Sequence, residues 1–170
     1  MPLPAPPTFA LALLMAFLNP HLAAASQPQP VVPAYQIAAL EDWLDLNSPW
    51  PRKQARPQIR LVSQGEANAL TGRAGRLGVT PRAFYDPAKS VIALISPFDP
   101  HDPYDLLVVL HELVHHRQHG AAHWYCAGVQ EKSAYELQSQ WLAERGLPDR
   151  INWIAVILEA GCTPRDIHPD

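Results

Sequence analysis

Apolar residues recur at helical spacing in several separate segments of the chain. Residues 35–46 (YQIAALEDWLDL) repeat apolar side chains every three or four positions and stop before an Asn-Ser-Pro sequence. The same spacing, between clear start and stop residues, is found in residues 103–119, 128–145 and 149–160. The first of these three follows Asp102, a good N-cap residue. The pattern therefore predicts an entry helix and three consecutive C-terminal helices.

Alternation of apolar and polar positions predicts strands between these helices. Residues 58–63 (QIRLVS) alternate as a half-buried strand does. Residues 83–96 (AFYDPAKSVIALIS) contain two β-type runs separated by Asp86 and Pro87, which indicates either a hairpin or one bent strand. A short helix is expected over residues 65–76. The resulting order is typical of an α+β fold, and we expect a short, mostly antiparallel sheet.

The N-terminal region has the features of an export signal. An apolar stretch from Phe9 to Leu18 is followed by a proline and by small residues at Ala23 to Ala25, as at a secretory cleavage site. We expect residues 1–25 to be a signal peptide and residues 26–34 to be a proline-rich linker. The alternatives are a membrane anchor, for which the stretch is short, and a wrongly assigned start codon. The prediction is a secreted or periplasmic protein with one domain over residues 35–170.

Composition limits the possible partners. The chain has 170 residues, of which 48% are hydrophobic, and a formal net charge of −3. It contains no run of lysine or arginine, so nothing favours a nucleic acid or an anionic membrane surface as a partner. After the predicted signal peptide no segment is apolar for long enough to span a bilayer, so we expect no membrane span in the mature chain.

The chain has only two cysteines, Cys126 and Cys162. Export would place both in an oxidising compartment, and each lies at the open end of a predicted helical hairpin. We expect them to form a disulfide, with two buried thiols as the alternative. Their spacing does not indicate a metal site made of thiolates.

Chemistry is concentrated in the predicted helix over residues 103–119. Its sequence HELVH places His111 and His115 four residues apart, so both imidazoles lie on one face and can reach a single metal ion. Glu112 lies about 100° further round the helix, where a carboxylate can take a proton from water without ligating the metal. The other positions are mainly apolar, which predicts burial nearly all round. Polar residues in such surroundings indicate a metal site or a hydrogen-bonded core network.

A catalytic zinc site normally has a third protein ligand. Helical spacing places Glu131 on the inward face of the helix over residues 128–145 and Glu136 on its outer face. An inward carboxylate favours a cation, although a glutamate near a helix start can also bind backbone N–H groups. His119 continues the histidine face of the preceding helix and is the second candidate for the third ligand. His116 points elsewhere, so we expect it to be structural or exposed.

The HELVH motif followed by a helix with an inward glutamate resembles the zincin metallopeptidases, and more narrowly their gluzincin branch. The resemblance covers residues 83–146 and implies a small zincin-like domain, with a buried HExxH helix followed by a helical hairpin. It implies that His111, His115 and Glu131 bind Zn2+. It also implies that Glu112 is the catalytic base.

The chain departs from the related patterns at three positions. The metzincin branch continues the motif as HExxHxxGxxH, whereas this chain has Gln118 and Ala121 at the last two positions. Gluzincins carry an acidic residue one turn after the ligand glutamate, and this chain has Tyr135 there. The metzincin interpretation therefore fails, and the groups that orient the ligands must differ from those of gluzincins.

The resemblance implies zinc-dependent hydrolysis of a peptide bond in a peptide or protein substrate. Zinc would lower the pKa of a water molecule and Glu112 would take its proton. An edge strand from Ser90 to Ser96 would hold an extended peptide by backbone pairing. His123 and Tyr125 are candidates for a transition-state hydrogen-bond donor, or for packing residues. The alternatives are an inactive zinc-containing binding or regulatory module and a metal-free network of core polar groups.

Overall fold

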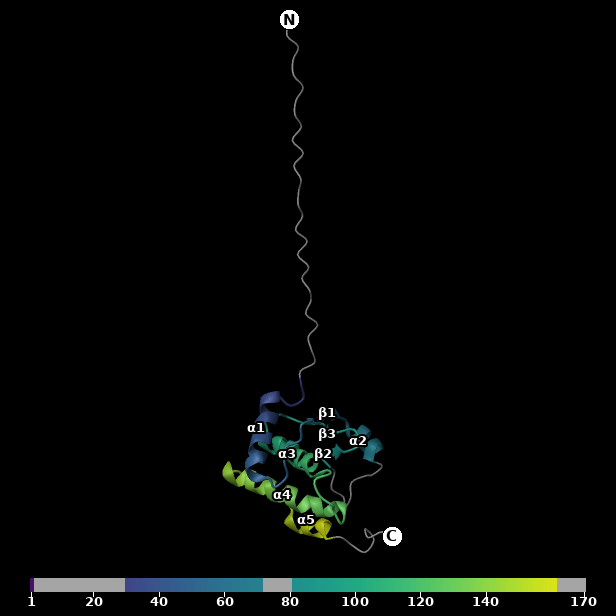
Figure 1. Cartoon of the computed structure of the whole chain (residues 1–170), viewed down its shortest axis with the longest axis vertical. Coiled ribbons are helices and arrows are strands. Elements are labelled where there is room, and N and C mark those ends of the chain that lie inside the picture. Colours follow the sequence, from purple (N-terminus) through teal and green to yellow (C-terminus); the bar gives the residue numbers. More distant parts are fainter. Residues whose placement is uncertain (2–29, 72–80, 162–170) are drawn as a thin grey trace.

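The computed structural model describes residues 1, 30–71 and 81–161 (Figure 1). The predicted signal peptide lies outside the described residues except for Met1, and so do residues 26–29 of the predicted linker. Cys126 is disulfide-bonded, whereas Cys162 lies outside the described residues, so their pairing stays a prediction. Within the described ranges no helix is long and apolar enough to cross a membrane.

The elements follow the order that the hydrophobic pattern predicts. They are α1 (Ala34–Asn47), β1 (Gln58–Val62), α2 (Gln64–Thr71), β2 (Ala83–Asp86), β3 (Val91–Ile95), α3 (Pro103–Gln118), α4 (Ala127–Glu144) and α5 (Trp153–Ala160). Among the element boundaries that the structure describes, the start of α5 differs most from the prediction, which places it at Asp149. The helix begins later because Asn152 is its N-cap, with a side chain that accepts the N–H of Ala155. Residues 72–76, the end of the helix expected around α2, lie outside the described residues.

The sheet is small and mixed. Its strand order is β1-β3-β2, with β3 parallel to β1 and antiparallel to β2. The expectation of a mostly antiparallel sheet therefore holds for only one of the two strand pairs. The expectation of an edge strand over Ser90–Ser96 is wrong, because β3 is paired on both sides. All five residues of β3 (VIALI) are buried, as a central strand covered on both faces requires, and the edge strand next to α3 is β2.

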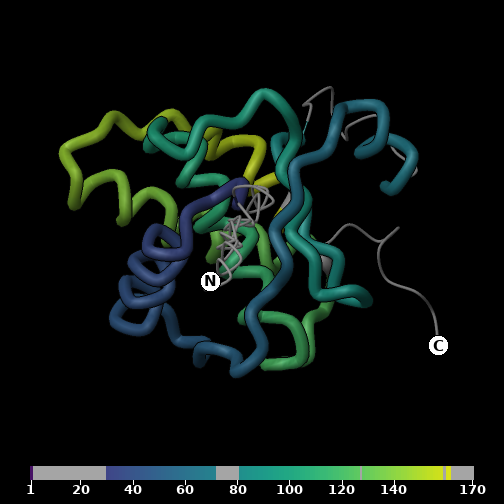
Figure 2. The backbone as a smooth tube through the Cα atoms, turned by 90° about the horizontal axis from the view of Figure 1, so that it is seen from above, coloured from purple at the N-terminus to yellow at the C-terminus, as the bar shows by residue number. Residues whose placement is uncertain are grey.

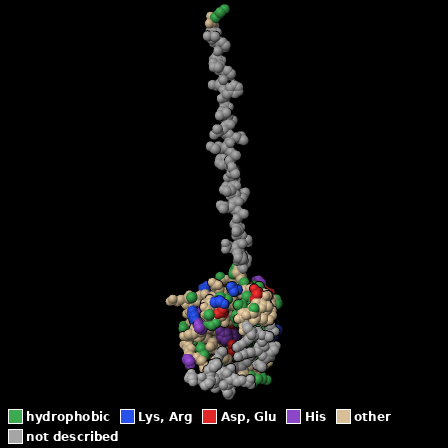
Figure 3. All heavy atoms as spheres, turned by 90° about the vertical axis from the view of Figure 1, so that its right-hand side faces the viewer, with side chains coloured by type: hydrophobic (Ala, Val, Ile, Leu, Met, Phe, Trp, Pro, Cys, Tyr) green, Lys and Arg blue, Asp and Glu red, His purple; other side chains and the backbone are tan. Residues whose placement is uncertain are grey.

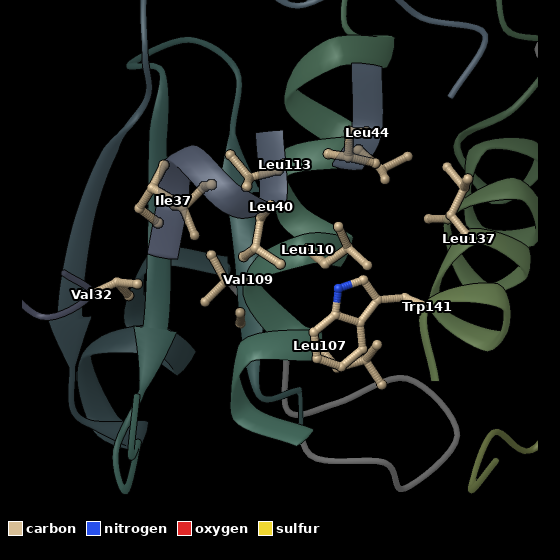
Figure 4. Close-up of a cluster of buried hydrophobic side chains, with 14 of the residues drawn as sticks. Val32, Ile37, Leu40, Leu44, Leu107, Val109, Leu110, Leu113, Leu137 and Trp141 are labelled. Atoms are coloured by element: carbon tan, nitrogen blue, oxygen red, sulfur yellow. The ribbon is translucent and has the colours of Figure 1, made fainter. Parts of the chain in front are cut away.

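Helix α3 lies between the sheet and α4, and α5 packs on the far side of α4 (Figure 1). Figure 4 shows Leu107, Leu110 and Leu113 of α3 in the core, in the same cluster as Leu40 and Leu44 of α1 and Trp141 of α4. Most residues of α3 are buried, as predicted. A second, smaller cluster lies under α2, where Ala67 packs with side chains of β1 and β3. The sheet is thus covered on one face by α2 and on the other by α3.

A buried ion network ties α1 to the last turn of α3. The Arg117 side chain is fully buried, and its Nε donates to the Glu41 carboxylate at 2.9 Å. Its Nη2 donates to the Glu41 backbone oxygen at 2.8 Å and to Asp45 Oδ1 at 2.7 Å. Arg52 joins the network through a 2.7 Å contact with Asp45. Because α1 supplies the counter-charges of a buried guanidinium, it is an integral part of the domain.

The connection from α1 to β1 also contacts the last turn of α3 (Figure 2). Arg117 Nη1 donates to the Trp50 backbone oxygen at 3.2 Å, and Lys53 Nζ donates to the His119 oxygen at 2.6 Å. His116 Nε2 lies 3.0 Å from the Ala55 oxygen. The C-terminal end of α3 is therefore fixed by hydrogen bonds to a segment more than sixty residues earlier in the sequence.

The ion network predicts a large loss of stability when one partner is removed. In Glu41→Ala the buried Arg117 loses its main counter-charge, so the free energy of unfolding should fall by about 3 kcal/mol, measured by urea denaturation. Asp42→Ala is the matched control, because Asp42 pairs with Arg52 at the surface with 72% of its side chain exposed. That change should stay within about 0.5 kcal/mol. Equal, small losses in the two variants would contradict the structural role of the network.

Candidate metal centre

A cleft of about 560 Å³ opens beside α3. One face of α3 lines the cleft, β2 and the residues just before it form one side, and α4 contributes the other side. Figure 3 shows histidine side chains near the centre of the domain face turned to the viewer, next to an acidic side chain. The cleft therefore exposes polar groups of a helix that is otherwise part of the core.

Three potential ligand atoms converge in this cleft. His111 Nε2 and His115 Nε2 lie 2.9 Å apart. Glu131 Oε2 is 3.1 Å from His111 Nε2, and Glu131 Oε1 is 3.4 Å from His115 Nε2. A tetrahedral zinc ion with bonds of about 2.0–2.1 Å holds its ligand atoms roughly 3.3 Å apart, which is close to these spacings. Two imidazoles and a carboxylate are also a donor set that catalytic zinc sites use, so the residues present fit this metal.

The positions of these three residues follow from helical periodicity on two packed helices. His111 and His115 are one turn apart on α3, on the face turned toward α4. Glu131 comes from the second turn of α4 and points toward them rather than binding backbone N–H groups. His119 lines the same cleft but is not among the three residues whose ligand atoms converge. The geometry thus brings together the predicted trio and favours Glu131 over His119 as the third ligand.

The ionisable groups of the cluster shift one another's pKa. Burial works to raise the pKa of Glu131, but hydrogen bonds with His111 and His115 outweigh it and lower the pKa below its usual range. Burial works to lower the pKa of His115, but the nearby carboxylates of Glu131 and Glu112 outweigh it and raise the pKa to about 9. The carboxylate of Glu131 therefore needs a positive charge beside it, which a metal ion or a protonated imidazole can supply.

Glu112 lies next to the cluster and is 5% exposed. Burial raises the pKa of its carboxyl, while the imidazoles of His111 and His115 and a hydrogen bond from the backbone of Tyr85 work in the opposite direction. The residue lines the cleft but is not one of the convergent ligands. A carboxylate with a raised pKa beside a metal site has the properties that a proton acceptor needs.

The two histidines of the cluster have unequal hydrogen-bond support. His115 Nδ1 lies 2.9 Å from Gln118 Oε1. His111 Nδ1 is buried and has no hydrogen-bond partner among the described residues. The Tyr135 ring lies edge-on to His111 with the ring centroids 4.7 Å apart, at the place where gluzincins carry an acidic residue. Gln118 is a mismatch to the metzincin pattern, but a polar residue in a buried apolar helix is itself a signal of a specific partner.

The remaining candidates from the sequence take other places. His116 is 3% exposed and structural: its Nε2 donates to the Ala55 oxygen and its Nδ1 accepts the Tyr85 hydroxyl, each at 3.0 Å. Burial lowers the pKa of His116, in keeping with this neutral form. His123 and Tyr125 do not line the cleft, and Tyr125 is 66% exposed. They are therefore not positioned as transition-state donors.

Comparison with known proteins finds a family match over most of the chain. A family model described as "Domain of unknown function (DUF6647)" matches residues 29–170. No curated protein and no solved structure matches the chain. The matched range includes every described element of the fold and all residues of the candidate metal centre, so this cluster belongs to the part of the chain that the family model covers.

The convergent geometry predicts one zinc ion per chain in protein purified under mild conditions. Glu131→Ala and His111→Ala should each lose most of the metal, measured by elemental analysis after gel filtration. Glu136→Ala is the matched control, because Glu136 lies on the same helix but is exposed and pairs with Lys132. It should retain the full zinc content. Metal-free wild type, or full zinc content in Glu131→Ala, would contradict the assigned ligands.

Proposed function

Since the chain belongs to the DUF6647 family, whose description assigns no activity, we propose from its metal centre that it is a zinc-dependent hydrolase of peptide bonds. Support comes from one observation: His111, His115 and Glu131 converge in an open cleft, with the buried carboxylate of Glu112 directly beside them. A purely structural metal site is closed by its protein ligands, whereas three ligands beside a cleft leave room for a substrate.

The roles of the residues follow from their positions. His111, His115 and Glu131 would hold the zinc ion, which would supply Lewis acidity that lowers the pKa of water and polarises a carbonyl group. Glu112 accepts the proton of the attacking water on its carboxylate and passes it to the leaving amine nitrogen. Its burial favours this role, because the protonated form is stabilised relative to an exposed glutamate.

The substrate is proposed to pair with β2, in place of the Ser90–Ser96 strand expected from the sequence. Ile95 N–H donates to the Arg82 oxygen at 2.9 Å, so alternate residues of β2 bond to β3. Ala83 and Tyr85 accordingly direct their backbone groups to the opposite side of the strand, where the cleft lies. The Tyr85 backbone also hydrogen-bonds to Glu112. An extended peptide paired with this edge would thus pass directly beside the proposed base.

Glu112→Gln tests the catalytic role. The amide cannot accept the proton, so hydrolysis of an unfolded protein or a peptide library should fall by about 10²- to 10⁴-fold while the zinc content stays at the wild-type level. Turnover is measured by mass spectrometry of the products, and zinc by elemental analysis. If wild type holds zinc but cleaves no member of a broad library, the alternative of a zinc-containing binding module replaces the enzyme.

Ala83→Pro tests pairing with the β2 edge. Proline removes one N–H that faces the cleft and is not used by β3, so the sheet should persist. The KM for a cleaved peptide should rise about fivefold, as expected for one lost hydrogen bond worth about 1 kcal/mol, with zinc content unchanged. Ala83→Ser keeps the N–H and should retain the wild-type KM. Equal KM values for the proline and serine variants would argue against backbone pairing at this strand.

A further inference from the structure

We propose that Gln118 is a positioning residue that fixes the proton of His115 on Nδ1 and thereby directs the Nε2 lone pair to the metal. Its consequence for metal binding rests on the proposed zinc site, but the position of the proton does not. Gln118 has no exposed surface, and its amide lies between His115 of its own helix and the start of α4. Such a buried amide must satisfy its donors and its acceptor with neighbouring protein groups.

The partners of the amide determine which way it points. One end lies 3.2 Å from the Gln130 backbone oxygen, which can only accept a hydrogen bond. That end must therefore be the NH2 group, because the flipped amide would place two oxygen atoms against each other. The Ser133 hydroxyl, 2.8 Å from the same end, donates to the Gln130 oxygen and so accepts from Gln118. The orientation of the amide is thus set by a backbone carbonyl.

The amide orientation in turn places the proton of His115. With the NH2 group toward Gln130, the Gln118 oxygen faces His115 Nδ1 at 2.9 Å. An oxygen with only lone pairs needs a donor, so Nδ1 carries the proton. The proton-free nitrogen of the neutral ring is then Nε2, which is the atom that lies near His111 Nε2 and Glu131 Oε1. Gln118 therefore fixes which nitrogen of the neutral His115 ring is free to bind a metal.

The same amide also bridges the two helices that carry the ligands. It runs from the last turn of α3 to the first turn of α4, and Gln130 immediately precedes the ligand Glu131. One side chain consequently orients an imidazole and holds the backbone beside the carboxylate that completes the site. His111 has no comparable support, because its Nδ1 lacks a hydrogen-bond partner among the described residues. Of the two histidines, His115 is therefore the one whose ring orientation is fixed by a hydrogen bond to the protein.

A matched control exists at the other end of the same helix pair. Gln138 is also buried, at 6% exposure, and its Nε2 donates to the Leu107 backbone oxygen at 2.9 Å. It bridges α4 to α3 as Gln118 bridges α3 to α4, but none of its hydrogen bonds involves His111 or His115. Gln138→Leu thus removes a hydrogen bond between α3 and α4 but leaves the hydrogen bond between Gln118 and His115 in place.

The experiment compares wild type, Gln118→Leu and Gln138→Leu in the full chain. Zinc dissociation constants come from competition with a chelator, and NMR of ¹⁵N-labelled histidine side chains locates the ring protons. Wild type should show a His115 Nδ1–H signal that exchanges slowly with water, both without metal and with zinc. Gln118→Leu should raise the zinc dissociation constant about 10- to 100-fold and lose the slow exchange. Gln138→Leu should change neither, even if both variants lose similar stability to urea.

Each outcome decides a separate point. A wild-type His115 without a proton on Nδ1 would overturn the role of Gln118, and this result does not depend on whether any variant folds. Wild-type zinc affinity in folded Gln118→Leu would also overturn it, while leaving the zinc site itself intact. If wild type binds no zinc, a slowly exchanging Nδ1–H on a neutral His115 ring would support Gln118 as the positioning residue and reject the proposed function.

Discussion

The structure depends on the partners that the buried polar side chains at the end of α3 require. Arg117 pairs with α1, and Gln118 donates to α4. His116 contacts β2 and the connection from α1 to β1. These three consecutive residues face three different parts of the molecule, because successive positions on a helix are about 100° apart. Segments from across the sequence therefore meet at the end of α3, and the two histidines of the candidate metal centre lie one and two turns before it.

The same constraint explains why the candidate chemistry lies where it does. A helix surrounded by apolar packing offers a low-dielectric setting in which charges act strongly on one another. The opposed pKa shifts of Glu131 and Glu112 follow from this setting: the first carboxylate is compensated by two imidazoles, and burial dominates for the second. Two glutamates near the same histidines are thus differentiated by their surroundings, one suited to hold a cation and the other to take up a proton.

Local sequence pattern predicted the helices and the convergent trio well, since both follow from periodicity within a segment. The N-cap at Asp102 and the inward face of α4 are of this kind. The order of the strands was not predicted, because alternation identifies a strand but not its neighbours. The uninterrupted apolar run VIALI was the available sign that β3 is central. The role of Gln118 and the partners of Arg117 depend on contacts between distant segments, which no periodicity records.

The shortness of β2 would limit which peptides the proposed substrate cleft could hold. The strand has four residues, and only Ala83 and Tyr85 direct backbone groups away from β3 before the chain turns at Pro87. A chain paired with this edge would be held over a few residues, by groups that every amino acid possesses. Such an edge would select a peptide by its conformation and not by its sequence. The peptide must be extended, and one side of its backbone must be free to pair. Under the proposed function, an extended or partly unfolded segment would therefore fit this edge, whereas a compact domain without a loose loop would not.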